Sequence, residues 1–165
     1  QGILDLVPAG GGITETDWWR LTADITNTDG DITANLERVD TPAASYLGTG
    51  MAESSGIFTF PSTGYWIIMV HGVFAGASEN DMNCQTLVTL NNSAYAIQAW
   101  AVTGQRNAGS TVQTASSQLF LDVTSTTNVK VKFATGSLGS GSVLHGATDA
   151  TAHYSDFMFI RLGDT

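Results

Sequence analysis

The sequence has little positive charge and no long apolar run. Six of its 165 residues are lysine or arginine, against fifteen aspartates and glutamates, so the formal net charge is −9. Nucleic acids and anionic membranes bind basic patches, and this balance therefore argues against both as partners. No stretch of 18 apolar residues occurs, so we expect no membrane insertion. The acidity itself is typical of a protein kept soluble by its charge.

Cysteine is almost absent too. The single cysteine, Cys84, has no partner for an internal disulfide, so stability must come from packing or from assembly. Cys84 lies within an apolar-leaning segment, Met82 to Val88. We expect it to be a small buried hydrophobic residue, with a reactive thiol as the alternative.

Turn-forming and strand-forming residues dominate what is present. Serine and threonine supply 36 residues and glycine 18, while charged residues make up only 13%. This mixture favours many short strands, and no window combines a helical period with caps. About nine or ten strands are expected, and their spacing predicts an all-β antiparallel β-sandwich, with the jelly roll a strong candidate.

Two predicted strands are apolar on both faces. In residues 65–70 and 157–162, large apolar side chains occupy both alternating sets of positions. A strand with one wet face would alternate apolar and polar residues, so each of these needs a second partner. Either loops cover the second face or a symmetric oligomer shares it. The residues predicted for an oligomer interface are Tyr65, Trp66, Ile68, Phe157 and Phe159.

The amino-terminal segment has a different character. Residues 1–14 combine an apolar run with a glycine hinge, and residues 15–165 form the predicted domain. The apolar run has no local partner, so we expect it to be an anchoring arm that docks on a neighbouring subunit or a scaffold, with a disordered end as the alternative. The arm residues are Ile3, Leu4, Leu6 and Val7.

Several motifs resemble one family. The pattern Gly56-x-Phe58-Thr59, four residues, Gly64-x-Trp66-x-Ile68 resembles a signature of complement-type globular heads, a branch of the TNF jelly-roll superfamily. The segments 117–123 and 129–133 resemble a later hairpin of that family, and Ser155-x-Phe157 resembles the start of its closing strand. The resemblance covers roughly residues 15–165 and implies a TNF-like jelly roll that assembles as a homotrimer.

The composition is also similar to that of the jelly-roll domains in marine bacteriophage structural proteins, especially in segments 31–37, 48–51 and 159–165. This resemblance implies a trimeric knob on a virion surface, an extracellular location, and a role as capsid decoration or fibre head. The arm would then bind other virion proteins. The alternative is a module of the same fold that binds a host surface or a glycan.

Catalytic and metal motifs are scarce. No G-x-S-x-G pattern occurs, and the three histidines lack the spacing of strong zinc motifs, so we expect no enzyme activity and no cofactor. Weak calcium binding remains possible if Asp24, Asp29 and Asp31 converge, although the EF-hand frame fails because its first and twelfth ligands would be Ile25 and Leu36. For glycan recognition the candidates include Tyr46 and Trp100, as aromatic residues in or near predicted loops.

Overall fold

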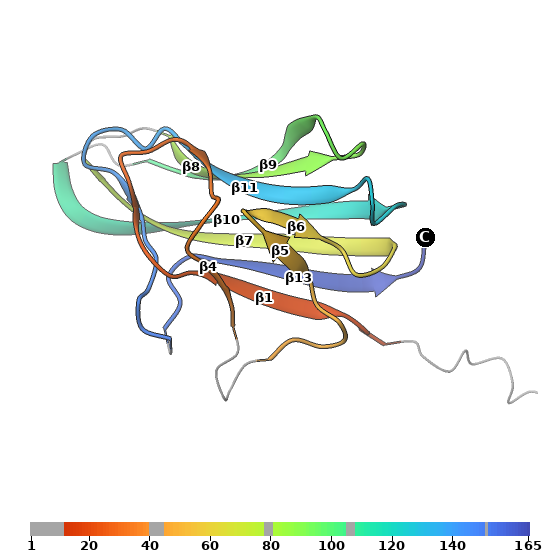
Figure 1. Ribbon diagram of the computed structural model, residues 1–165. Coiled ribbons are helices and arrows are strands. Elements are labelled where there is room, and N and C mark those ends of the chain that lie inside the picture. Colours follow the sequence, from red (N-terminus) through yellow and green to blue (C-terminus); the bar gives the residue numbers. More distant parts are fainter. Residues whose placement is uncertain (1–11, 40–44, 78–80, 105–107, 151) are drawn as a thin grey trace, which may run out of the picture.

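The chain forms two antiparallel sheets packed face to face (Figure 1). A computed structural model describes residues 12–39, 45–77, 81–104, 108–150 and 152–165. The first sheet contains β1 (Thr16–Leu21), β2 (Ile25–Thr26), β4 (Leu36–Arg38), β7 (Gly64–Ala77), β10 (Ala108–Val123), β12 (Val143–Leu144) and β13 (Asp156–Gly163). The second contains β3 (Gly30–Asp31), β5 (Ala52–Ser54), β6 (Ile57–Thr59), β8 (Met82–Thr89), β9 (Tyr95–Thr103) and β11 (Lys130–Gly136).

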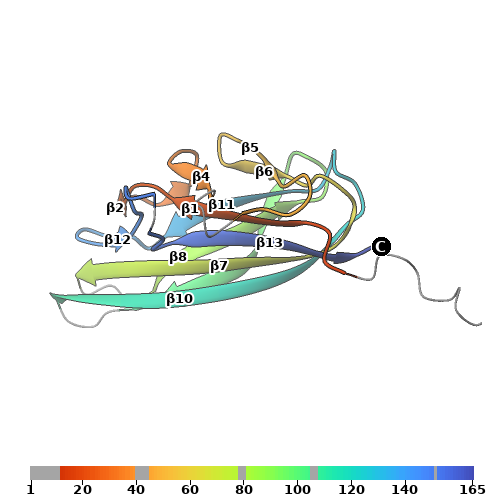
Figure 2. The ribbon, with the colours of Figure 1, turned by 90° about the horizontal axis from the view of Figure 1, so that it is seen from below.

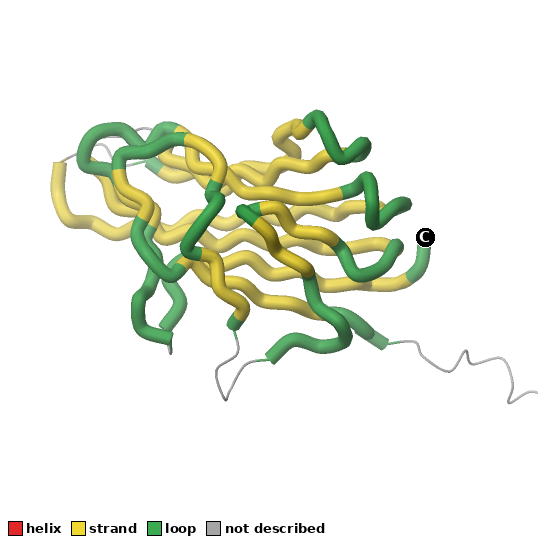
Figure 3. The backbone as a smooth tube through the Cα atoms, viewed as in Figure 1, coloured by secondary structure: helices red, strands yellow, loops and turns green. Residues whose placement is uncertain are grey.

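The strand order interleaves distant parts of the chain. The first sheet runs β2-β12-β7-β13-β1-β4, with β10 on the other edge of β7, and the second runs β5-β6-β11-β8-β9, with β3 beside β11. The predicted all-β sandwich is confirmed, and the described residues contain strands and loops but no helix (Figure 3). Thirteen strands are present in the described chain instead of nine or ten. Six of them are only two or three residues long, too short to produce a periodic signal.

The core between the sheets is built around aromatic rings. Phe58 of β6 lies 5.2 Å from the ring of Trp19, 5.5 Å from that of Phe133 and 5.2 Å from that of Phe159, measured between centroids. Phe133 in turn stacks on Phe157 at 4.1 Å. Each side chain of this size contributes roughly 1.5–3 kcal/mol when it is fully buried. These rings join both sheets into one hydrophobic core.

Two glycines in the family-like pattern have a steric explanation. Gly56 has φ +81°, and a Cβ atom there would lie 2.0 Å from the carbonyl oxygen of Ile32. Gly64 has φ +137°, and its Cβ would lie 2.3 Å from the carbonyl oxygen of Gly163. Residues with a Cβ atom rarely adopt these backbone conformations, and at both positions there is no space for a side chain. The two glycines therefore allow close backbone packing at the start of β6 and of β7.

One local expectation is wrong. The segments 117–123 and 129–133 do flank a turn, in which Val129 N donates to Ser125 O at 2.8 Å, but they do not pair with each other. Strand β10 pairs with β7 in the first sheet, whereas β11 pairs with β6 and β8 in the second. The chain thus crosses between sheets at this turn. Burial alternates at the start of β11, where Val131 and Phe133 lie in the core and Lys130 and Lys132 are only partly buried.

A buried carboxylate ties β1 to its neighbours. Asp17 accepts hydrogen bonds from Arg38 Nε at 2.9 Å, from Trp19 Nε1 at 2.9 Å and from Met51 N at 2.6 Å. The guanidinium of Arg38 also lies over the Trp19 ring, 5.0 Å from its centroid. Arg38 Nη2 donates to Asp17 as well, at 3.0 Å, so four donors compensate the buried charge, as a charge away from water requires.

Cys84 is fully buried within β8, which confirms the expected role as a small hydrophobic residue. Burial raises the pKa of its thiol to about 12. Because the thiolate is the nucleophilic form, this cysteine is inert in the folded protein at neutral pH.

Candidate self-association face

The surface of the first sheet that points away from the core carries a cluster of large apolar residues. Along β7, Trp66, Ile68 and Val70 enter the core, so the alternate residues, Tyr65, Ile67 and Met69, point outward. The register places Phe120 and Ile160 beside Ile67 and Met158 beside Met69, whereas the polar residues Gln118 and Asp122 of β10 lie beside Met69 and Tyr65. The outer face, as we call this surface, is formed by Tyr65, Ile67 and Met69 of β7, Met158 and Ile160 of β13, and Phe120 of β10.

Cross-strand contacts order this outer face. Ile67 lies between Ile160 of β13 and Phe120 of β10, and Met69 lies beside Met158. Phe120 is 60% exposed and stacks on Tyr65, with ring centroids 5.3 Å apart and planes inclined by only 16°. In Figure 2 the strands that carry these residues, β7, β10 and β13, lie along the lower side of the molecule, and no described segment is drawn beneath them. The face is therefore a preformed apolar platform without an intramolecular cover in the described chain.

The structure changes the interface residues expected from the sequence. Tyr65 lies on the outer face, but Trp66, Ile68, Phe157 and Phe159 are buried in the core of the protomer and cannot contact another copy. The interface assignment of these four residues is wrong. Alternation alone leaves the choice between the two sets of positions open.

A signal that distinguishes the faces was nevertheless present in the sequence. His71 shares its face of β7 with Ile67 and Met69, and Asp156 shares its face of β13 with Met158. When a polar residue lies on the same face of a strand as a row of apolar residues, it indicates that this face is the one in contact with solvent. The anchoring arm residues Ile3, Leu4, Leu6 and Val7 lie outside the described residues.

A polar cluster interrupts the outer face. His71 Nδ1 lies 3.6 Å from Asp156 Oδ2, and the ring of His153 lies 4.8 Å from that of Trp18 on the neighbouring strand β1. Burial raises the pKa of Asp156, while Trp18 and the two histidines act in the opposite direction. The cluster therefore holds a carboxyl group that is only partly compensated in the single chain.

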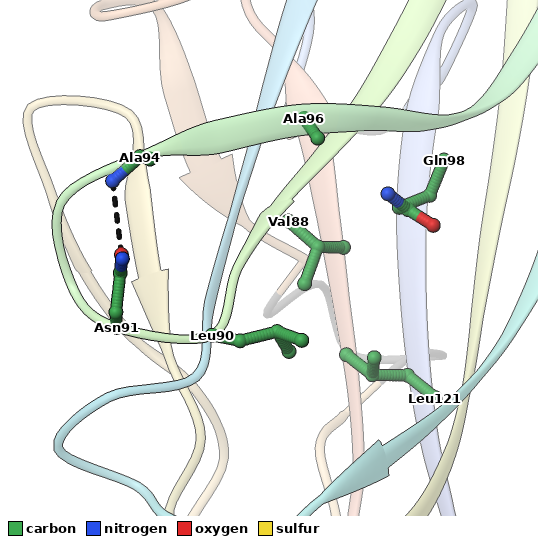
Figure 4. Close-up of a pocket in the computed structure, with 7 residues that line it drawn as sticks. All are labelled: Val88, Leu90, Asn91, Ala94, Ala96, Gln98 and Leu121. Carbon is green, nitrogen blue, oxygen red and sulfur yellow. Dashed lines mark hydrogen bonds between the residues drawn. The ribbon is translucent and has the colours of Figure 1, made fainter.

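A cleft opens beside this face, where the edges of the two sheets meet. Strand β9 ends the second sheet, β10 ends the first, and Thr103 Oγ1 donates to Gln113 Oε1 at 2.7 Å between them. Figure 4 shows the cleft, which has a volume of about 320 Å³, with the side chains of Val88, Leu90 and Leu121 pointing into it. Its full lining is Val88, Leu90, Asn91, Ala94, Ala96, Gln98 and Leu121.

The described residues contain no metal site of the kind considered in the sequence. Across that part of the chain, no group of three or more histidine, cysteine, aspartate or glutamate side chains could hold a metal ion. The three aspartates considered for calcium have separate partners: Gly146 N donates to Asp24, Leu138 N donates to Asp29, and Lys132 pairs with Asp31. Within the same residues, no helix is long and apolar enough to cross a membrane.

Comparisons with solved structures identify the fold. Eiger TNF from S. frugiperda matches with a TM-score of 0.66 at 10% identity, covering 93% of this chain and 96% of that one. The globular domain of the zebrafish complement 1qA protein matches with a TM-score of 0.56 at 10% identity, covering 92% and 99%. PRD1 vertex protein P5 matches with a TM-score of 0.51 at 13% identity, covering 93% and 100%.

No protein-family model and no curated protein matches the sequence. The structural likeness, at these low identities, establishes the fold alone. The chain has the TNF-like jelly-roll fold that the sequence motifs predicted.

Proposed function

We propose that this chain is a non-enzymatic structural protein that associates with itself, forming a trimeric jelly-roll knob on a phage particle. Its role there is capsid decoration or a fibre head at the virion surface. The observation that carries self-association is the outer face, on which Tyr65, Ile67, Met69, Met158, Ile160 and Phe120 form one apolar platform.

The energetic argument starts from the cost of leaving this face in water. Complete burial of one large apolar side chain contributes roughly 1.5–3 kcal/mol. The residues of the outer face are only partly buried in the single chain, so covering them in an assembly would add the remaining part of that contribution. Contiguous apolar patches of this kind usually mark contact surfaces or aggregation hazards. A closed assembly buries the face and leaves no surplus patch to recruit further copies.

The number three comes from the family resemblance, and the surface offers the two patches that such a ring needs. A ring of identical subunits joins one patch of each copy to a different patch of the next. The outer face is one patch. The second is the neighbouring edge, where the apolar cleft between β9 and β10 accepts side chains from the adjacent copy.

The proposed location on a virion is supported by two separate likenesses. One is the composition and short segments shared with phage structural proteins, and the other is the fold shared with a phage vertex protein. The arm, residues 1–14, then connects the knob to other virion proteins.

Light scattering coupled to gel filtration tests the assembly at micromolar concentration. We expect a mass three times the protomer mass of 17.3 kDa. A mass equal to that of one protomer would overturn the proposed trimer. The location is tested separately, by mass spectrometry and electron microscopy of purified particles from the source virus. Absence of the chain from those particles would overturn the virion role and leave the assembly result intact.

A further inference from the structure

An exposed tryptophan lies on the solvent face of the second sheet, on the opposite side of the sandwich from the outer face. Trp100 of β9 is 58% exposed and pairs across the strands with Gln85 of β8. The sequence predicts a position in or near a loop for Trp100, whereas the structure places it within strand β9. An indole held on a rigid sheet offers a flat apolar surface with little entropy to lose on binding.

Two side-chain amides are held in place on the neighbouring strand β8, where Gln85 is the cross-strand partner of Trp100 and Asn83 that of Val102. Gln85 Nε2 donates to Asn83 Oδ1 at 2.9 Å, and Asn83 Nδ2 donates to the carbonyl oxygen of Asp81 at 2.8 Å. Both amides lie over Gly136 of the adjacent strand, where a Cβ atom would come within 2.5 Å of Gln85 Nε2 and 2.6 Å of Asn83 Oδ1. Within the described residues, Gln85 Oε1 has no hydrogen-bond partner, so an acceptor remains available next to Trp100.

A β-bulge shapes the surface next to the tryptophan. Thr86 pairs with Ala99 but Leu87 pairs with Ile97, so Gln98 is an extra residue in β9. Because of this extra residue, Ile97 and Trp100 face the same side although they are three positions apart. A hollow of about 250 Å³ lies at this point, lined by residues 97–100. Bulges often re-aim side chains beside binding sites.

The charge that lies across the sheet from Gln85 is compensated. Ala134 and then Asp31 follow Gln85 across the sheet, and Asp31 is paired with Lys132, whose Nζ lies 2.6 Å from Asp31 Oδ2. The site combines a flat aromatic face, a small apolar hollow and oriented neutral amides.

We propose that Trp100, Gln85 and Asn83 form a binding site for a neutral oligosaccharide. The C–H face of a sugar ring carries slight positive charge and is attracted to the negative face of the indole. Sugar hydroxyl groups both donate and accept, which suits the free Gln85 oxygen and the remaining amide hydrogens. A purely apolar protein partner would leave these amides without bonds, at a cost for each buried group. The site lies on the opposite side of the sandwich from the outer face, and its hollow shares Gln98 with the cleft at the β9–β10 edge.

The test is titration calorimetry of the full chain with four neutral oligosaccharide probes: β-1,4-linked glucose, β-1,4-linked N-acetylglucosamine, α-1,4-linked glucose and α-linked mannose. At concentrations up to about 10 mM, dissociation constants in the millimolar range are measurable. We expect at least one probe to bind. We expect Trp100→Ala to weaken that binding about tenfold, as loss of an aromatic contact does. Trp100→Phe should retain part of it, and Gln85→Ala should weaken it severalfold.

Tyr154→Ala is the matched control, because Tyr154 is another exposed aromatic residue in a distant loop. Its binding should equal that of the unmodified chain, and all variants should keep the same thermal midpoint. The proposal is overturned if no probe binds, or if Trp100→Ala binds as tightly as the unmodified chain. It is also overturned if Trp100→Ala changes the oligomeric mass and not sugar binding, since Trp100 would then serve a protein contact.

Discussion

Ile67 and Ile68 are adjacent in the chain but belong to opposite faces of the first sheet. Ile68 is buried among the aromatic rings of the core, and Ile67 lies on the outer face between Ile160 and Phe120. The two side chains have the same chemistry and the same local backbone. They therefore allow a clean separation of folding from assembly.

We expect Ile68→Asp to prevent stable folding and Ile67→Asp to prevent self-association only. A charge at position 68 would be buried in the core without a partner, which costs several kcal/mol. At position 67 the charge remains in water in the single chain and becomes costly only when another copy covers it. Circular dichroism reports folding, and light scattering reports the mass. If Ile67→Asp still forms the full oligomer, the outer face is not the contact surface.

Phe159→Asp should behave like Ile68→Asp, because Phe159 packs against Phe58 at 5.2 Å between ring centroids. Ile160→Asp, one position further on β13, is its matched partner on the outer face and should fold as a monomer. A folded, soluble Phe159→Asp variant would contradict the core assignment of this strand.

Substitution of Gly56 by alanine should destabilise the fold strongly. The new Cβ would lie 2.0 Å from the Ile32 carbonyl oxygen, and the positive φ adds about 1 kcal/mol. Gly30→Ala is the control, because Gly30 also has a positive φ, +135°, but nothing lies within 4 Å of its Cβ position. Urea unfolding should give a loss for Gly56→Ala at least about 2 kcal/mol larger than for Gly30→Ala. Equal losses would show that the backbone moves to accept the methyl group.

The sequence was sufficient to predict the fold class and the two-faced strands, because both depend on local alternation. The choice of face depends on which side the second sheet covers. His71 and Asp156 indicate the solvent side locally, but the residues that cover the other side, such as Phe58 and Phe133, lie far away in the sequence. The pairing of segment 117–123 was misjudged for a similar reason. The strand that follows it in the chain is β11, but the strand that pairs with it is β7, which lies about fifty residues earlier in the sequence.

The Trp100 site shows the limit of sequence reasoning for a binding surface. Trp100, Gln85 and Gly136 come from three different strands, and only the register brings them together. The bulge at Gln98 shifts that register by one residue, and the sequence pattern around Gln98 does not predict it. An isolated tryptophan in the sequence carries no information about the amides beside it.

Cys84 should react with thiol reagents only when the protein unfolds. Its thiol is fully buried, and its pKa of about 12 leaves almost no thiolate at neutral pH. We expect labelling with 5,5′-dithiobis(2-nitrobenzoate) to follow the unfolding transition in urea. Rapid labelling of the native protein would show that β8 opens locally far below the unfolding midpoint.

Loss of the Asp17 carboxylate should be much more costly than loss of an exposed one. In Asp17→Ala, Arg38 Nε, Trp19 Nε1 and Met51 N all lose their acceptor inside the fold. Removing one member of a buried pair typically costs about 3–5 kcal/mol. Asp164→Ala is the control, since Asp164 is 93% exposed and pairs with Arg161 at the surface, where pairs contribute at most about 1 kcal/mol. Similar free energies of unfolding for the two variants would contradict the structural role of Asp17.

Asp156 should make the stability of the single chain depend on pH in the direction opposite to most carboxyl groups. Burial raises its pKa in the folded state, so the folded chain binds the proton more tightly than the unfolded chain does. Its contribution is fully present below the ordinary aspartate pKa and is lost as the pH rises through the raised value. Asparagine at this position cannot titrate, so Asp156→Asn should stabilise the fold more at pH 7 than at pH 4. Urea unfolding at both pH values, with Ile67→Asp in both proteins to keep them monomeric, measures this difference. A variant whose advantage is equal at the two pH values, or larger in acid, would show that His71, His153 and Trp18 fully compensate the buried carboxylate.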